Sequence, residues 1–381
     1  MSFQDNYNIR KHSIKEVGRD NMWYKNSVTQ YLNIKYPIIQ AGMAGGVTTP
    51  ELVAAVSNAG ALGTLGAGYM SPTQMQDNIR KIKKLTNKPF GVNLFIPEIP
   101  DVIDQEIEKA NAWLQPFREE LNIMEKPEVK KGTASIFEEQ IQIILEEKIP
   151  VCSFTFGIPS KEVVQQLKKR NVVVIGTATT VNEAIANEEN GMDMVVVQGS
   201  EAGGHRGTFM GQFEEAMIGT MALVPQSVDQ VKIPVIAAGG IMDGRGVLSA
   251  LILGAQAVQM GTAFVTSLES GASPQHKEAI LNSIEEQSVV TSAFSGKPAR
   301  GIRNEFITKM TKYEKELPKY PIQNTLTKKI RSEAAKQNRP EWMSLWCGQN
   351  PRLSKPQSAM EVVSEICSQV ADIVKSKKEE W

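Results

Sequence analysis

Cysteine and histidine are both scarce in this chain, and neither sign of charge is in excess. Only three cysteines and three histidines occur among 381 residues. The cysteines are far apart and odd in number, which argues against a disulfide framework and against a CxxC metal site. We therefore expect reduced thiols and no bound metal, with Cys152 as a small core residue. The 42 basic and 42 acidic residues give no net charge, which disfavours a nucleic-acid-binding protein.

Long apolar runs are also missing. No stretch approaches the roughly 18 residues that a membrane helix needs, and the polar N-terminal residues contain no apolar segment of a secretory signal. We therefore expect a cytoplasmic protein with no membrane partner. Residues 1–35 are interpreted as a tail and lead-in, because residues 1–21 carry no periodic apolar pattern.

Eight short apolar runs alternate with helical segments from Tyr36 onward. They are Pro37–Gln40, Ala61–Leu65, Phe90–Phe95, Val151–Phe156, Val172–Gly176, Asp193–Gln198, Val235–Ala238 and Ala257–Met260. Several of these runs are apolar at successive positions, which is typical of strands buried on both faces. Eight such units favour a closed (β/α)8 TIM barrel over an open sheet, and we assign residues 36–271 to it.

Two additions to the barrel are expected. Apolar residues recur at helical spacing within residues 102–147, which predicts a helical insertion at the barrel mouth. The strand pattern stops after Gly271. Residues 272–381 are therefore expected to form a helical appendage that packs on the barrel.

Glycines gather where the last two predicted strands end. Gly239 and Gly240 follow the seventh run, and Gly261 with Thr262 follows the eighth. Glycine loops at these positions of a barrel commonly bind phosphate, although they could also be simple tight turns. The chain has neither a GxGxxG after a first strand nor a GxxxxGK[ST] motif, so a Rossmann or P-loop nucleotide site is not supported.

Two polar residues stand out near strand ends. His205 lies in a glycine-rich loop after the sixth run, where a neutral imidazole could accept a proton or hydrogen-bond an anion; a structural histidine is the alternative. Asn93 lies inside the third run. Its buried amide needs a hydrogen-bond partner, which could be a ligand or a neighbouring strand.

Five segments in order resemble the FMN-dependent nitronate monooxygenases: YPIIQAGMAGGVTTPELVAAVSNAGALGTLG, FGVNLF, VVVQGSEAGGHRG, IPVIAAGGIMDGRG and AVQMGTAF. The later segments AFSGKPARGIRNEF, LPKYPIQNTLT and LWCGQN resemble the class I type of that family. The resemblance implies a barrel that binds FMN. We expect this binding to be non-covalent, because no cysteine or histidine stands in a recognisable flavinylation context. The resemblance also implies oxidation of alkyl nitronates, such as propionate 3-nitronate, by O2 to a carbonyl compound and nitrite, a detoxification.

The same resemblance implies roles for individual residues. Contacts to the flavin fall on Ala41, Gly42, Met43, Asn93 and Gln198, and contacts to its phosphate on Gly203, Gly240, Gln259, Met260, Gly261 and Thr262. Relatives often have proline where this chain has Gly42, so the first loop departs from the family pattern. His205 takes the catalytic position.

Two functions are open for His205, and three residues are candidates for the substrate. A protonated or hydrogen-bonding His205 would balance the charge of a nitronate, which we favour, whereas a neutral one could deprotonate a nitroalkane. Tyr320, Lys297 and Arg300 are candidates for contacting a substrate carboxylate or nitro group, although the two basic residues could equally bind internal carboxylates.

Other functions compete with the monooxygenase. An FMN-dependent enoyl-acyl-carrier-protein reductase has a similar EAGGH loop and uses NAD(P)H, but the helical insertion and the PARGIRN, YPIQN and WCGQ segments favour the monooxygenase. A flavin-free phosphate-binding isomerase or lyase and a flavin-binding module without turnover are further alternatives. We expect a small nitronate and O2 as partners, and a homodimer is a candidate assembly.

Overall fold

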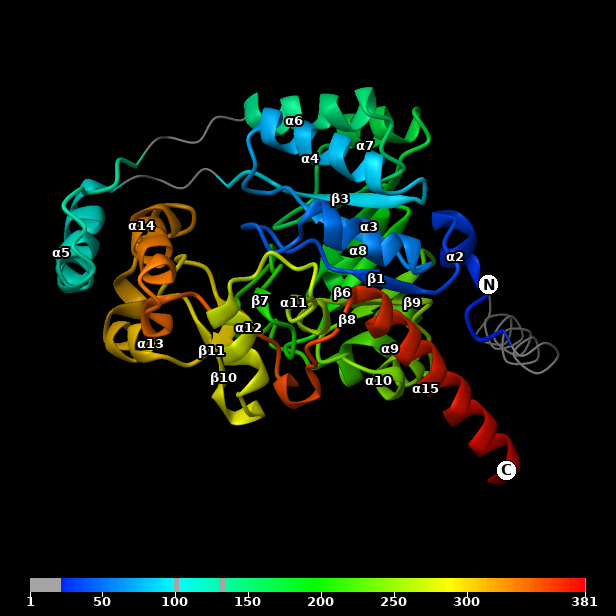
Figure 1. The fold of residues 1–381 in the computed structure, drawn as a ribbon. Coiled ribbons are helices and arrows are strands. Elements are labelled where there is room, and N and C mark those ends of the chain that lie inside the picture. The colour runs from blue at the N-terminus through cyan, green and yellow to red at the C-terminus, as the bar shows by residue number, and fades with distance from the viewer. Residues whose placement is uncertain (1–21, 99–102, 130–134, 381) are drawn as a thin grey trace.

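A barrel of eight parallel strands forms the centre of the computed structural model, which describes residues 22–98, 103–129 and 135–380 (Figure 1). The strands are β1 (Ile38–Gln40), β2 (Gly63–Gly66), β3 (Phe90–Phe95), β4 (Val151–Thr155), β5 (Val173–Ala178), β6 (Met194–Gln198), β8 (Val235–Ala238) and β9 (Ala257–Met260). Their order is β1-β9-β8-β6-β5-β4-β3-β2, and a parallel bridge between Ile39 and Leu62 joins the first to the last. The predicted TIM barrel is therefore confirmed. The N-terminal residues 1–21, expected to form a tail, lie outside the described ranges.

Helices surround the barrel and begin at residues that the sequence marks. The helices are α2 (Ser27–Leu32), α3 (Pro50–Asn58), α4 (Pro72–Leu85), α6 (Ser135–Glu146), α7 (Lys161–Lys168), α8 (Val181–Glu189), α9 (Thr220–Gln230), α10 (Gly244–Ile252) and α15 (Ala359–Glu380). The Thr49 hydroxyl accepts the Leu52 N–H at the start of α3. The Asp243 carboxylate accepts the N–H groups of Arg245 and Gly246 at the start of α10. These caps satisfy backbone donors that a helix leaves unpaired.

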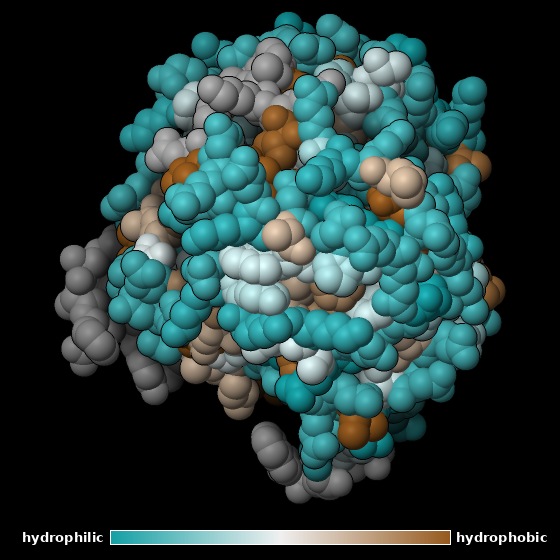
Figure 2. All heavy atoms as spheres, turned by 90° about the vertical axis from the view of Figure 1, so that its left-hand side faces the viewer, coloured by the Kyte–Doolittle hydropathy of each residue, from teal (hydrophilic) through white to brown (hydrophobic). Residues whose placement is uncertain are grey.

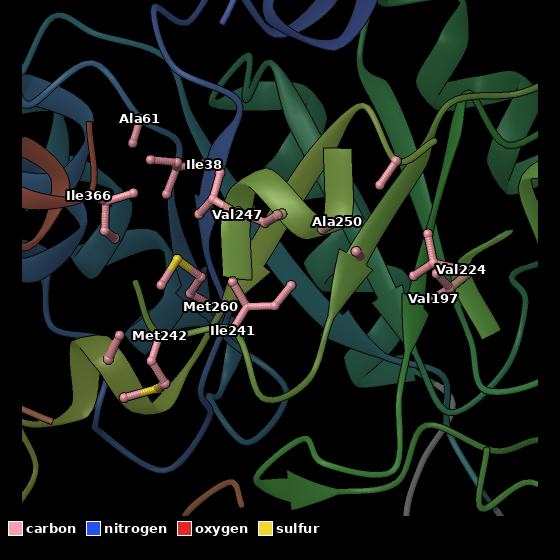
Figure 3. Packing of buried hydrophobic residues seen from close by; sticks show 14 of the residues in the cluster. Ile38, Ala61, Val197, Val224, Ile241, Met242, Val247, Ala250, Met260 and Ile366 are labelled. Carbon is pink, nitrogen blue, oxygen red and sulfur yellow. The ribbon is translucent and has the colours of Figure 1, made fainter. Parts of the chain in front are cut away.

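The main core lies between the strands and the outer helices. Ile38 and Met260, from neighbouring strands, belong to one buried cluster with Val247 of α10 and Ile366 of α15 (Figure 3). The last helix therefore returns to the barrel and contacts α10 and α3. It covers apolar side chains of those helices. The sequence analysis placed residues 272–381 together in the appendage, but α15 packs against the barrel.

A second core holds the appendage together. The elements between the last barrel strand and α15 are α11 (Thr262–Val265), α12 (Pro274–Leu281), η1 (Glu285–Gln287), β10 (Ser288–Thr291), β11 (Ala299–Ile302), α13 (Glu305–Met310), η2 (Thr311–Glu316), α14 (Ile322–Lys336), η3 (Pro340–Trp342) and η4 (Pro351–Leu353). The strands β10 and β11 correct the expectation that only helices follow Gly271. Each has four residues, which is too short for an alternating pattern to stand out.

The two helices of the insertion lie on different parts of the molecule. Helix α5 (Asp104–Glu120) contacts α14, and the Arg118 guanidinium reaches the Leu326 carbonyl. Helix α6 contacts α4 instead, so it belongs to the outer layer of the barrel (Figure 1). Figure 2 views the molecule from the side of α5 and α14, and this face is largely hydrophilic with scattered hydrophobic residues. Within the described ranges, none of the helices combines the length and apolar composition needed to cross a bilayer.

Helix α15 should stabilise the barrel through its buried side chains. We expect Ile366→Ala to lower the free energy of unfolding by about 2–5 kcal/mol, because Ile366 is 2% exposed and its loss leaves a cavity. The control is Met360→Ala on the same helix, since Met360 is 54% exposed and should change stability by less than about 0.5 kcal/mol. Denaturant unfolding measures both, and equal losses would contradict the packing role of α15.

Candidate active site

His205 lies where the barrel meets the appendage. It forms the two-residue strand β7 (Gly204–His205), which follows β6 and pairs antiparallel with β11 in a three-stranded sheet. Ala299 is the partner of His205 in this pairing. The Gln198 side chain at the end of β6 donates to the His205 carbonyl at 3.0 Å and accepts the Gly207 N–H at 2.9 Å. Residues of the barrel and of the appendage therefore fix the histidine together at the barrel mouth.

Aromatic rings surround the imidazole of His205. Phe156, Tyr320 and Trp346 have ring centroids 5.9, 6.2 and 5.3 Å from it. Phe156 has a φ of 72°, a left-handed conformation that costs energy for a bulky residue and is concentrated at functional sites. The Nε2 atom of His205 is buried and has no hydrogen-bond partner. This orphaned nitrogen could serve a ligand.

The imidazole is neutral. Burial, together with the positive charges of Arg331 and Lys297, lowers the pKa of His205 to about 3. Part of the residue reaches solvent, but Nε2 itself does not, so desolvation acts directly on the titrating atom. The surroundings of His205 therefore disfavour the protonated form that the sequence analysis considered. A neutral ring can still accept or donate one hydrogen bond at Nε2.

The sequence candidates for substrate contact have different environments. Tyr320 is buried, and burial and the neighbouring Tyr69 hydroxyl both raise its pKa. The Lys297 ammonium pairs with the Glu98 carboxylate at 2.5 Å and lies 4.7 Å from the centre of the Phe156 ring. Lys297 thus binds the internal carboxylate that the sequence left open as an alternative.

Arg300 holds backbone segments beside the site. Its buried guanidinium donates to the carbonyls of Ser200 and Ser288. A buried guanidinium requires such acceptors, and here the loop after β6 and the strand β10 supply them. These bonds give Arg300 a structural role, and its predicted contact with a substrate stays a prediction.

Ala41, Gly42 and Asn93, which are assigned to the flavin ring, lie near one another at the ends of neighbouring strands. Ala41 donates its N–H to the Met260 carbonyl, which joins the ends of β1 and β9. A Cβ atom at Gly42 would lie 2.5 Å from the Asn93 Cβ, so only glycine allows this approach. Asn93 donates to the hydroxyls of Ser153 and Thr155, while its Oδ1 is buried without a partner. This acceptor and the close glycine fit a planar ligand that hydrogen-bonds here.

The glycines assigned to the phosphate lie under the C-terminal WCGQN segment. A Cβ at Gly203 would lie 2.5 Å from the Gly348 nitrogen, and Gly348 donates to the Thr262 hydroxyl at 2.9 Å. Gly240, with a φ of 69°, accepts a hydrogen bond from the Asn350 side chain. Residues from three distant parts of the chain therefore form one glycine-lined loop cluster.

A surface pocket of about 550 Å³ lies beside this cluster, between α9 and α10. Its lining includes Gly239 and Gly240 but not His205, and it also includes the carboxylates of Glu201, Glu285 and Glu286. Glu285 is paired with Arg352, whereas Glu201 and Glu286 form no ion pair within the described ranges, and their carboxylates repel an anion. The pocket is therefore unsuited to a phosphate, and we favour the inner side of the glycines.

The closed barrel and the buried histidine at its strand ends define a TIM-barrel enzyme. The family model described as nitronate monooxygenase matches residues 25–369, and the chain belongs to that family of oxidoreductases. A probable nitronate monooxygenase of Staphylococcus haemolyticus is 54% identical over 355 residues, which cover 93% of this chain and 99% of the relative. A probable nitronate monooxygenase of Staphylococcus aureus is also 54% identical, with 93% and 100% coverage.

Solved structures agree with this membership. A nitroalkane oxidase from Streptomyces ansochromogenes has a TM-score of 0.87 at 36% identity and covers 92% of this chain and 99% of its own. FabK from Thermotoga maritima has a lower TM-score of 0.75 at 32% identity, with 94% and 99% coverage. An enoyl reductase domain from Bacillus amyloliquefaciens, at 12% identity and a TM-score of 0.63, shares the fold alone.

The neutral His205 should make stability depend on acid pH. In the unfolded chain a histidine gains its proton near pH 6.5, whereas His205 in the folded chain stays neutral down to about pH 3. Protonation then favours the unfolded state, so wild type should lose stability relative to His205→Asn as the pH falls. Between pH 6.5 and pH 5 we expect a relative loss of about 1.5 kcal/mol, measured by denaturant unfolding of both proteins at each pH. A constant difference would show that His205 titrates normally.

Proposed function

We propose that the protein oxidises alkyl nitronates with O2, with FMN as its cofactor, to a carbonyl compound and nitrite. Its membership of the nitronate monooxygenase family and its similarity to a nitroalkane oxidase support this. The observation that carries the proposal is the orphaned Nε2 of His205, which lies inside an aromatic enclosure under the influence of two cationic side chains. Such a site favours a small anion over a neutral ligand.

His205 acts in its neutral form in this proposal. A nitronate has already lost its proton, so it requires a hydrogen bond and charge balance and has no need of a base. The Nε2 of a neutral tautomer donates the hydrogen bond, and Arg331, the cation near His205 that is not paired with Glu98, balances the charge. With a neutral nitroalkane, the other tautomer accepts the proton at the same atom. One residue therefore supports both reactions, with the nitronate preferred.

FMN fits the residues at the barrel mouth. Asn93 Oδ1 and the close approach at Gly42 suit the flavin ring, and the loops at Gly203, Gly240, Gln259, Met260, Gly261 and Thr262 suit a single phosphate. When bound, FMN would supply the electron acceptor that the side chains of this site lack. Gln198, which the family resemblance assigns to the flavin, would also fix the loop beside it, because both ends of its amide hold the backbone at His205 and Gly207.

Gly240 should be essential for holding the cofactor. We expect Gly240→Val to weaken FMN binding at least tenfold, about 1.4 kcal/mol, because a side chain there blocks close backbone approach and strains a φ of 69°. Gly191→Val is the matched control, since Gly191 also has a positive φ but lies after α8, away from these loops. Flavin content after dialysis measures both. Equal retention in the two variants would contradict a role of the glycine-lined loops in binding the phosphate.

Anaerobic reduction of the bound flavin tests the reaction itself. Propionate 3-nitronate should reduce the flavin of the wild type, whereas NADPH should not. His205→Asn should reduce the rate with the nitronate about tenfold to a hundredfold, because it removes a hydrogen bond that strengthens in the transition state. Reduction by NADPH alone would favour the enoyl reductase, the second candidate, which the FabK similarity supports. Wild-type rates in His205→Asn with full flavin content would leave the histidine a structural role.

A further inference from the structure

A buried carboxylate on helix α8 contacts the loop that follows His205. Glu183 is 0% exposed, and its Oε1 accepts the N–H groups of Phe209 and Met210 at 2.6 and 2.8 Å. Its Oε2 accepts the N–H and the hydroxyl of Thr179 at 2.5 and 2.7 Å. All four partners are donors, and a carboxylate can accept all of them, whereas an amide would turn its own donors toward two of them. The contacts at position 183 therefore require an acid.

The start of helix α8 does not by itself account for this carboxylate. The Thr180 hydroxyl already caps the helix by accepting the Glu183 N–H. A carboxylate is costly to bury unless its hydrogen bonds and charge are satisfied. Two of its four hydrogen bonds go to the segment between β7 and α9, residues 206–219, which contains no helix or strand. Glu183 thus stabilises a segment that has no regular structure to hold it.

A buried cation within the same loop carries the opposite charge. Arg206 follows His205 directly, is 1% exposed, and donates to the carbonyls of Gly199 and Ala216 at 2.5 and 2.8 Å. Burial is the main cause that lowers the pKa of Arg206 to about 10, and the negative charge of Glu183 acts against this shift. The two charges therefore stabilise each other, and each of them also holds the backbone of the loop.

The five residues after His205 are all held by neighbouring elements. The hydrogen bonds run from the Arg206 N–H to the Pro298 carbonyl, from the Gly207 N–H to Gln198, from the Thr208 hydroxyl to that of Thr179, and from the N–H groups of Phe209 and Met210 to Glu183. The Thr179 hydroxyl donates its proton to Glu183, so Thr208 is the donor in their bond and is linked to the same carboxylate. Glu183 therefore fixes, directly or through Thr179, the last three of the five.

A shift of this segment would be transmitted to the imidazole. His205 belongs to a strand of only two residues, so few other hydrogen bonds oppose its movement. A displacement of about 1 Å at a catalytic group can lower the rate by about a hundredfold. The charges that act on the pKa of His205 are those of Arg331 and Lys297. Glu183 consequently acts on His205 through geometry and not through charge.

We propose that Glu183 is a positioning residue for His205, and that its carboxylate sets the place of the imidazole by fixing Phe209 and Met210, with Arg206 as the balancing charge. This rests on the role of His205 in the proposed function, and it adds a residue from outside the barrel mouth to that role.

Glu183→Gln tests this contact, because it keeps the size of the side chain and removes half of its acceptors. Hydrogen exchange at the Phe209 and Met210 amides of the flavin-loaded enzyme should become about tenfold faster. The kcat for propionate 3-nitronate should fall about tenfold, while KM and flavin content change less than about twofold. Glu189→Gln is the matched control, since Glu189 is exposed in the last turn of the same helix. It should change none of these quantities.

A double variant shows whether Glu183 acts through His205. In a His205→Asn background, Glu183→Gln should lower kcat by less than about twofold, because the group that it positions is already absent. Equal losses of kcat in both backgrounds would show that Glu183 only stabilises the fold and would overturn the proposal. Unchanged amide exchange in Glu183→Gln would overturn it as well.

Thr208→Val provides the test if Glu183→Gln does not fold. It removes the hydroxyl that links the loop to Glu183 through Thr179 and keeps the size of the side chain. It should speed exchange at Phe209 and lower kcat, again without a further loss in the His205→Asn background, and an unchanged kcat would overturn the proposal. Wild-type rates in His205→Asn alone would refute the proposed role of His205 instead.

Discussion

The pairing of β7 with β11 is the contact on which the site depends. His205 opposes Ala299 in this pairing, and the next N–H along the chain, that of Arg206, donates to the Pro298 carbonyl. A two-residue strand has little stability by itself, because few hydrogen bonds offset the entropy of fixing the loop. Gln198 and Arg300 supply further bonds to the loop from opposite sides. The position of the imidazole thus depends on residues nearly a hundred positions away in the chain.

The neutral His205 and the charged residues near it have separate roles at this site. Burial keeps His205 neutral, and the cations around it make a proton on the ring still less favourable. Of these two cations, Lys297 is paired with Glu98, so Arg331 is the one that makes the enclosure favourable for an anion. A site built this way can hydrogen-bond an anionic substrate through a neutral ring while a separate guanidinium balances the charge. The low pKa of His205 and the proposed affinity for anions therefore have one electrostatic cause.

Local patterns in the sequence account for the barrel. The eight apolar runs are all strands, because a strand buried on both faces requires successive apolar side chains. Thr49 and Asp243 cap the helices they precede, since capping depends on residues only two or three positions apart. The glycine loops and His205 were also visible, because they follow strands directly.

Only the tertiary structure decided what surrounds the histidine. Phe156, Trp346 and Arg331 come from separate elements, and no spacing between them records their approach to His205. The sequence also offered Lys297 and Arg300 as equal candidates, and their packing separated them: one pairs with Glu98, and the other holds backbone carbonyls. The amino-acid sequence by itself determined the barrel and the place of His205 after the sixth strand, because these follow from short-range periodicity and chain direction, whereas the pairing that makes His205 part of strand β7 was not visible in it. The protonation state of His205 and the role of each cation depend on burial and on contacts between distant residues, and these exist only in the folded chain.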